Sequence, residues 1–271
     1  MEPFVFSEAP AGLTASDFVQ LVREDESFYR AFRNLRTTAY RFETTLTMYD
    51  KRAGEAAHYR ATIRQHSDGD CRWNVVEDRA VRGRLYKRAE PRFYTYKLYD
   101  RLFLTRDTVC ESTVVDDAGK LTERTDQLKA LVFRPGEAVD VPFFGDKLDV
   151  FSEKRSRYYD YVIDTADYRG TSCYVFRVTV KPAYRDRKED KTVLQHLETY
   201  FRRDDFQVVA RDYRLRYDGL GYDFDVAFVM RLHRIDGRYF PAYLSYVGNW
   251  NIPFKRREIG RFEVTLGDFG E

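Results

Sequence analysis

The sequence of 271 residues has no long apolar run, and nothing in it approaches the roughly 18 consecutive apolar residues of a membrane-spanning helix. Cysteine is scarce: only Cys71, Cys110 and Cys173 occur, with no CxxC pair among them. An odd, widely spaced set excludes a dense disulfide framework and a cysteine-based zinc site. We expect most of the three to be buried thiols, although one disulfide plus one free thiol also fits the count.

Histidine is scarce too, and its spacing carries no catalytic or metal motif. The four histidines are His58, His66, His196 and His233, and no two lie within four residues of each other. The chain also lacks GxSxG, P-loop and GxGxxG motifs. We therefore predict no catalytic residue, no metal site and no cofactor, and favour a protein that is not an enzyme. A hydrolase with dispersed catalytic residues stays open, because triad members can be far apart in the chain.

Charge of one sign is not in excess. The 46 basic and 44 acidic residues leave a net charge of +2, and the two signs alternate along the chain. A nucleic-acid-binding protein would show basic clustering and a higher pI. We therefore expect no nucleic-acid partner.

Aromatic residues are abundant, at 16% of the chain, with 21 Tyr and 21 Phe but only 2 Trp. Aromatic side chains favour pleated, half-buried surfaces. Tyrosine also suits places where one end of the ring is dry and the other wet. This composition predicts a broad, concave β-sheet.

The first element expected is an amphipathic helix over residues 16–36, after a tail of residues 1–15. Its apolar residues recur at three-, four- and six-residue steps, which indicates one buried stripe. The sheet is the only surface that the stripe could cover. The stripe consists of Phe18, Leu21, Val22, Phe28, Phe32 and Leu35.

After residue 36 the apolar period changes to two, which predicts antiparallel strands joined by short turns. The alternation is clearest over 222–232, where even positions are apolar and odd positions include Asp223 and Asp225. Residues 85–104 are aromatic but interrupted by Pro91, and we assign short strand pieces there. The fold class expected is mainly β (α+β), a curved antiparallel meander or half-open β-barrel forming one domain over 16–271. Other strands are expected at 40–48, 58–65, 71–76, 128–133, 158–163, 173–180, 193–201, 213–217, 240–246 and 262–266.

Residues 141–151 have helical rather than strand spacing and concentrate large apolar side chains. We predict that they form a short lid over the open side of the sheet, because such groups are rarely left exposed. Closure of an ordinary core by the same side chains is the alternative. The apolar ligand-binding residues expected on this lid and on the clearest strand are Phe143, Phe144, Leu148, Phe151, Tyr222, Phe224, Phe228 and Met230.

The order of elements over 158–269 resembles that of the outer-membrane lipoprotein carrier and receptor family (LolA/LolB-like). The resemblance includes an aromatic strand, the Tyr-Val-Phe-Arg-Val strand at 174–178, an Asp-Asp turn at 204–205, and Gly-Arg-Tyr-Phe-Pro at 237–241. It implies a half-open barrel that holds acyl chains. Against it, the chain is longer than the carriers, its first half fits poorly, and no N-terminal lipid-attachment cysteine occurs.

The sequence as a whole predicts a non-enzymatic binding protein of the cell envelope that holds a lipid, a lipoprotein acyl chain or another apolar ligand. A lipoprotein or an envelope protein is the expected partner. A structural or interaction domain with a filled interior is a further alternative. A periplasmic or outer-membrane-associated location assumes a removed signal peptide, since residues 1–10 lack a basic start followed by an apolar stretch; a cytoplasmic location stays open.

Overall fold

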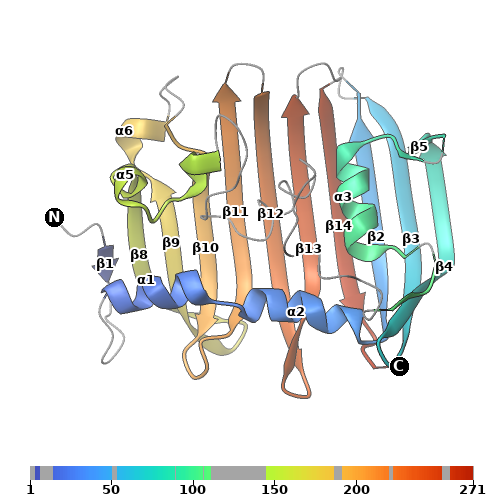
Figure 1. The fold of residues 1–271 in the computed structure, drawn as a ribbon, viewed down its shortest axis with the longest axis horizontal. Helices are drawn as coiled ribbons and strands as arrows, with labels where there is room; N and C mark the ends of the chain where they lie inside the picture. Colours follow the sequence, from blue (N-terminus) through green and yellow to red (C-terminus); the bar gives the residue numbers. More distant parts are fainter. Residues whose placement is uncertain are drawn as a thin grey trace.

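The computed structural model describes residues 4–6, 15–50, 54–88, 90–105, 107–110, 145–185, 191–219, 222–251 and 257–270. The described residues form a curved, mainly antiparallel sheet of twelve strands that is not closed into a barrel (Figure 1). The prediction of a mainly β, curved antiparallel sheet with an N-terminal helical segment is confirmed. The predicted strand at 128–133 lies outside the described residues.

Two meanders make up the sheet, and they join where the last strand pairs with an early one. The strand order is β1-β8-β9-β10-β11-β12-β13-β14-β2-β3-β4-β7, and only β1 pairs in parallel, with β8. The first meander is β2 (Tyr40–Tyr49), β3 (Glu55–Asp68) and β4 (Cys71–Gly83). The second is β8 (Tyr159–Tyr168), β9 (Thr171–Val180), β10 (Leu194–Arg202), β11 (Val208–Gly219), β12 (Tyr222–Ile235), β13 (Arg238–Asn251) and β14 (Glu258–Gly267). The short edge strands are β1 (Phe4–Phe6) and β7 (Val109–Cys110), and β5 (Tyr86–Lys87) forms a separate hairpin with β6 (Glu90–Pro91).

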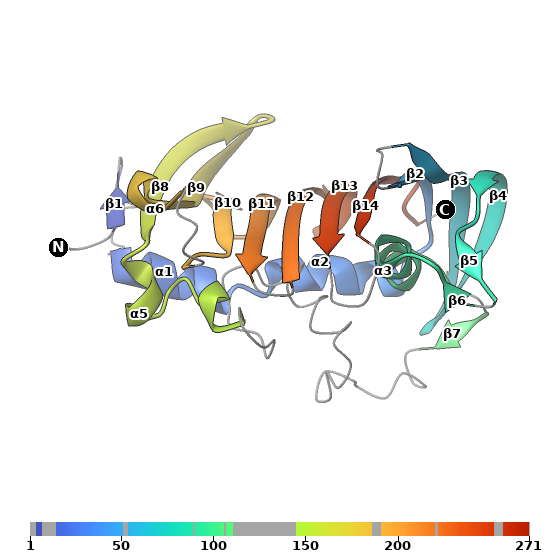
Figure 2. The same cartoon turned by 90° about the horizontal axis from the view of Figure 1, so that it is seen from above.

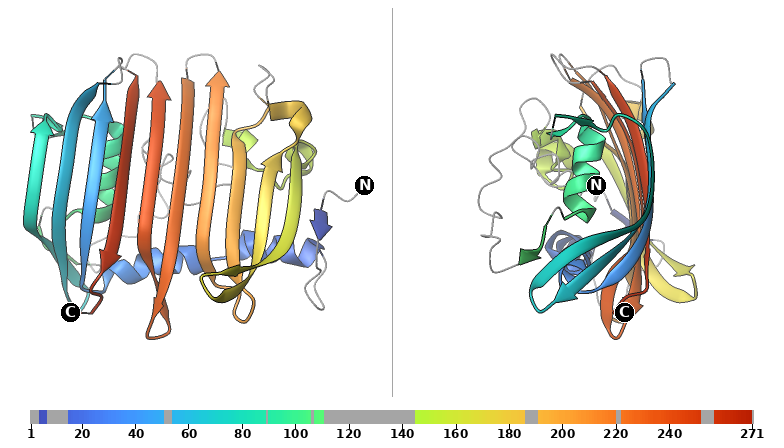
Figure 3. Two further views of the ribbon diagram at one scale, coloured as in Figure 1. Left: turned by 180° about the vertical axis from the view of Figure 1, so that it is seen from behind. Right: turned by 90° about the vertical axis from the view of Figure 1, so that its right-hand side faces the viewer.

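The helices lie on the concave face of the sheet. Figure 2 shows α1 (Ala15–Glu24), α2 (Ser27–Arg36), α3 (Tyr94–Phe103) and α5 (Glu153–Ser156) on the same side of the central strands. From behind, the strands stand in front of these helices, and the side view shows the sheet bowed around them (Figure 3). A short helix α6 (Pro182–Arg185) follows β9.

Alternation along β12 separates the two faces as predicted. Phe224, Val226, Phe228 and Met230 are at most 3% exposed, whereas the side chain of Asp225 is 35% exposed. Because successive side chains in a strand point to opposite faces, this strand places its apolar set under the helices and its carboxylates on the convex surface.

The N-terminal helix is interrupted, which the sequence did not predict. Asp25 follows the last residue of α1, and its carboxylate accepts hydrogen bonds from the backbone N and the Oγ of Ser27 at 3.0 and 2.6 Å, which satisfies an unpaired N–H at the start of α2. Phe28 and Leu35 are buried as predicted and Val22 and Phe32 pack against the core, but Leu21 is 39% exposed, so its assignment to the buried stripe was wrong. The side chain of Phe18 lies outside the described part of the chain.

Residues 94–103 form a helix, so the prediction of short strand pieces over 85–104 is confirmed only for β5 and β6 and was wrong for the remainder. Tyr96, Tyr99 and Phe103 repeat at three- and four-residue steps, and all three are buried. Their helical spacing was obscured by Pro91, which lies in the hairpin just before the helix. The rings pack on β2, β3 and β14, where Tyr99 and Phe262 have centroids 5.7 Å apart.

A carboxylate from a distant strand caps α3. Glu258, only 8% exposed, accepts hydrogen bonds from the backbone N atoms of Tyr94 and Thr95 at 2.8 and 2.7 Å. A negative charge at a helix N-terminus satisfies unpaired N–H groups and interacts favourably with the helix dipole.

We expect Glu258→Ala to lower the free energy of unfolding by about 2–3 kcal/mol, because two charge-assisted hydrogen bonds are lost and two buried N–H groups are left without partners. Glu263→Ala is the matched control, since Glu263 is exposed on the same strand and its loss should change stability by at most ~0.5 kcal/mol. Urea unfolding of both variants measures the difference. Equal destabilisation would refute the capping role.

The cysteines also differ from expectation. Cys71 and Cys110 form a disulfide between β4 and β7, so the prediction that most cysteines are buried thiols was wrong. Cys173 is a free, buried thiol, and burial raises its pKa to about 11. The disulfide depends on the register of the short edge strand β7 against β4. The two cysteines are 39 residues apart, and the sequence offers no local signal for their pairing.

Candidate functional site

An aromatic layer covers the concave face from β8 to β14. It arises because each strand turns its alternate aromatic residues toward the helices, so that rings on neighbouring strands stack across the sheet. Ring centroids lie 5.1 Å apart for Tyr213 and Phe228, and 4.9 Å apart for Phe224 and Trp250. The aromatic side chains of β11, β12 and β13 on the predicted binding surface are therefore continuous in space.

Phe224, Phe228 and Met230, three of the residues predicted to bind an apolar ligand, all lie on this layer. Phe228 belongs to the middle of β12, and Phe224 lies four residues nearer the start of the strand. All three side chains are buried. The side chain of Tyr222, also predicted to line the site, lies outside the described part of the chain.

The predicted lid is helical only in part. Residues Gly145–Leu148 form a 3-10 turn, η3, while Phe143 and Phe144 lie outside the described residues. Leu148 is fully buried, and the ring of Phe151 is 6.1 Å from that of Phe176 on β9. The Nζ of Lys147 lies 4.8 Å from the centroid of the Tyr217 ring on β11. This segment therefore lies against the concave face across β8 to β11. The other residues predicted to bind the ligand lie on β12, the next strand of the sheet after β11.

Two glycines give tyrosine rings room to lie along this face. A Cβ at Gly248 would be 2.4 Å from the hydroxyl of Tyr246, and one at Gly219 would be 2.4 Å from the hydroxyl of Tyr217. Each glycine follows its tyrosine by two residues and so shares its face. The Tyr246 hydroxyl accepts a hydrogen bond from Nε1 of Trp250 at 2.7 Å. The Tyr-x-Gly spacing in a strand is a sequence signal that could have identified these positions.

A buried ion pair joins the helical layer to this face. Arg211 of β11 and Asp25 at the α1–α2 break are 3.7 Å apart, with side chains only 9% and 8% exposed. The Arg211 guanidinium also lies 4.4 Å above the Phe28 ring, and its Nε donates to Oγ1 of Thr199. Sequence reasoning missed this pair, although Arg211 occupies the same face as Tyr213, Leu215 and Tyr217 and is the one charged residue in that series.

The convex face is polar and carries several ion pairs. Arg214 pairs with Asp225 at 2.6 Å, and Arg41 and Arg64 both pair with Glu77. These two arginines lower the pKa of Glu77 by hydrogen bonding to its carboxylate. Exposed pairs of this kind contribute little to stability, and they fit a solvated outer surface.

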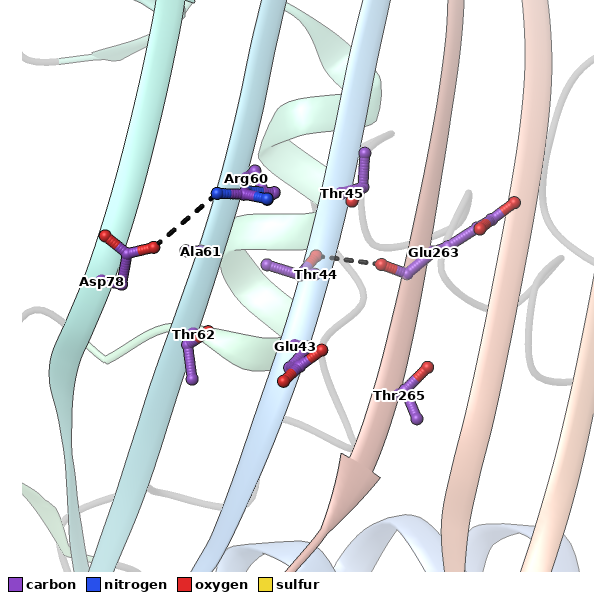
Figure 4. A pocket seen from close by; sticks show the side chains of 9 residues that line it. All are labelled: Glu43, Thr44, Thr45, Arg60, Ala61, Thr62, Asp78, Glu263 and Thr265. Carbon is purple, nitrogen blue, oxygen red and sulfur yellow. Dashed lines mark hydrogen bonds and ion pairs between the residues drawn. The ribbon is translucent and has the colours of Figure 1, made fainter.

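A shallow polar hollow of about 310 Å³ opens on this convex face, over β14, β2, β3 and β4 (Figure 4). Arg60 and Asp78 face each other across it at 4.0 Å, and Thr44 donates a hydrogen bond to the backbone oxygen of Glu263. Both charged side chains are about two-thirds exposed. The hollow therefore offers a ligand neither burial nor a convergent set of polar groups.

Two further hollows adjoin each other beside α1 and α2, with volumes of about 310 and 360 Å³. Ser27, Arg30, Asp205 and Gln207 line both. The first also has an apolar wall that includes Leu21, Val22, Phe201 and Phe206.

The histidines have ordinary structural surroundings. His58 shares a hydrogen bond with Thr47 at 3.2 Å, and His66 stacks on Trp73. His196 is 3.9 Å from Glu198, and His233 is exposed. Within the described ranges, no group of three or more His, Cys, Asp or Glu residues is arranged to hold a metal ion.

Comparison with known proteins gives no family assignment. No family model matches the chain, and no curated protein matches it. Among solved structures, a DUF1329 family protein from Desulfovibrio piger covers 90% of each chain at 11% identity, with a TM-score of 0.26. A likeness this weak assigns neither a fold nor a function. No helix among the described residues has the length and apolar character needed to cross a bilayer.

Proposed function

We propose that this chain is a non-enzymatic binding protein that holds an acyl chain or another apolar ligand against the concave aromatic face. The observation that carries the proposal is the division of the sheet: aromatic side chains line one face beneath the helices, while paired charges cover the other. Apolar ligand sites are typically concave and lined by aromatic side chains, with few polar groups. The LolA/LolB-like order of elements agrees with this function.

The ligand face we propose centres on Phe224, Trp250 and Tyr217, beside the η3 turn. Trp250 is only partly buried although it packs against the core, and its indole stacks on Phe224. Lys147 reaches Tyr217 from the helical side. An ammonium group at the rim of an apolar surface suits a ligand that has an anionic head and an apolar tail.

We also propose that the protein works in the cell envelope, and the disulfide supports this location. Disulfides such as Cys71–Cys110 persist in oxidising compartments and are rare in the cytosol. This agrees with the periplasmic or outer-membrane-associated location expected from the resemblance.

A structural or interaction domain is the second candidate, and the burial of the layer favours it. Phe224, Phe228 and Met230 are at most 3% exposed, so the aromatic layer that they belong to is already covered. In a carrier, the ligand must displace part of that cover; in an interaction domain, the cover is permanent. Ligand titration separates the two.

We expect the protein to bind a fluorescent fatty acid saturably, and Trp250→Asn to weaken that binding at least about tenfold, because an amide on the apolar wall loses its hydrogen bonds to water when the site fills. Trp250 stacks on Phe224 but is only partly buried, so the variant should fold. Val247→Asn is the control, since Val247 is 48% exposed on a convex position of β13. Fluorescence titration measures both. Absence of saturable binding by the folded protein would support the interaction domain instead.

A further inference from the structure

Basic charge is concentrated in one short segment. Residues 79–92 contain six basic residues and one acidic residue, whereas the whole chain carries a net charge of +2. The remainder of the chain is therefore net negative. The mixing of the two signs expected along the whole chain therefore does not hold in this segment.

The segment forms one corner of the sheet, at the end of β4 and in the β5–β6 hairpin (Figure 1). Arg79, Arg84, Lys87 and Arg88 are exposed there and form no ion pair with any residue that the structure describes. This differs from the convex face, where arginines such as Arg214 are matched by carboxylates. Arg82 of the same segment pairs with Glu55 at 3.1 Å, so the corner keeps four cations that no carboxylate of the described residues matches.

The hairpin is anchored by one buried side chain and closed by a backbone hydrogen bond. Leu85 is buried, and its carbonyl oxygen accepts a hydrogen bond from the backbone N of Arg92 at 2.8 Å. Gly83 has φ of 74°, and a Cβ there would be 2.3 Å from the carbonyl oxygen of Ala56. Only glycine fits this close approach, which turns the chain from β4 into the hairpin.

Exposed apolar side chains stand among these cations. Val81 is 49% exposed and Tyr86 is 45% exposed. The Tyr86 hydroxyl shares a hydrogen bond with that of Tyr96 at 2.8 Å, which fixes the ring beside α3. Val76, 45% exposed, pairs with Ile63 of β3 as Val81 pairs with Tyr59, so it continues the apolar surface along the same face of β4.

We propose that this corner, formed by residues 79–88 and 90–92, docks the protein on a bilayer surface that carries anionic headgroups. Clustered Lys and Arg attract such a surface, while aliphatic and tyrosine side chains suit the boundary between headgroups and acyl chains. The valine side chains favour a lipid surface over a nucleic acid, which would be held by cations and stacked rings. The inference goes beyond the proposed function, because docking needs no ligand on the concave face.

The test is flotation of the full chain, without added fatty acid, on vesicles of phosphatidylcholine with 30% phosphatidylglycerol, roughly the anionic fraction that a polybasic segment responds to. Each basic residue near an anionic leaflet strengthens binding about fivefold, so losing three should weaken it on the order of 100-fold, and reversing their charge should weaken it further. The variant is Arg84→Glu with Lys87→Glu and Arg88→Glu. The control reverses three exposed arginines elsewhere, Arg216, Arg234 and Arg261, and should retain markedly more binding.

Binding to the anionic vesicles that is lost in the hairpin variant and at high salt supports docking. Equal weakening by the control set, equal binding to pure phosphatidylcholine vesicles, or no vesicle binding would overturn it. Tighter binding to a single-stranded oligonucleotide than to the vesicles would overturn it in favour of a nucleic acid. Should the triple variant fail to fold, Lys87→Gln with Arg88→Gln provides a milder version, expected to weaken vesicle binding by more than tenfold.

Discussion

Replacing Phe228 with alanine is expected to lower the free energy of unfolding by about 3–5 kcal/mol. The ring is 1% exposed in the middle of β12 and stacks on Tyr213, so its removal leaves a cavity in the aromatic layer. Urea unfolding monitored by circular dichroism measures the loss. A smaller cost would mean that the layer collapses around the missing ring or is loosely packed.

Val229→Ala provides the matched control for this substitution. Val229 is the next residue of the same strand, points to the convex face and is only partly buried. Its truncation should cost about 1 kcal/mol. Similar losses for the two variants would contradict the division of the sheet into a packed face and a solvated face.

Removing the Arg211 guanidinium should lower the free energy of unfolding by as much as Phe228→Ala does. Arg211→Ala leaves the Asp25 carboxylate buried without its cation, and breaking a buried pair in this way typically costs about 3–5 kcal/mol. Thr199 would also lose a hydrogen bond from Arg211 Nε. Because Asp25 bonds to the backbone at the start of α2, we expect the loss to appear as loosening of the helical layer, which hydrogen exchange of α1 and α2 would detect.

Arg214→Ala is the control for Arg211→Ala, since Arg214 lies on the same strand but pairs with Asp225 on the exposed convex face. That pair should contribute at most about 1 kcal/mol. In a double-mutant cycle, adding Asp25→Ala to Arg211→Ala should recover part of the loss, because no charge is then left buried alone. Additive losses from the two substitutions would show that the pair is not coupled.

Strand alternation was the part of the fold most readily predicted from the sequence. In β12 the residue pattern alone separates buried from exposed positions, because register errors of one residue would expose Phe224 and Phe228. The N-terminal stripe likewise indicated that Phe28 and Leu35 are buried. The stripe is interrupted at Asp25, because an aspartate side chain favours helix ends over helix interiors and here bonds to the backbone N of Ser27.

Pairing over long distances could not be predicted. The sheet is continuous only because β14 pairs with β2, for example at Phe262 and Leu46, and no local pattern encodes that contact. The disulfide, the capping of α3 by Glu258 and the pairing of Arg211 with Asp25 all depend on the same assembly. For the candidate site, the sequence therefore indicated the aromatic face but missed the polar contacts that position the helices over it.

The two tryptophans provide a direct test of ligand binding on the concave face. Trp250 lies on that face against Phe224, whereas Trp73 stacks on His66, whose neighbour Gln65 points the other way and bonds to α2. A brominated fatty acid quenches indole fluorescence only at close range. Trp73→Phe leaves Trp250 as the reporter, and Trp250→Phe leaves Trp73.

The decisive measurement is titration of both single-tryptophan variants with dibromostearic acid, with stearic acid as the unbrominated control. Binding on the concave face predicts saturable quenching of Trp250, no quenching of Trp73, and no effect of stearic acid beyond a small spectral shift. Quenching of neither tryptophan, or equal quenching of both, would contradict binding on the concave face.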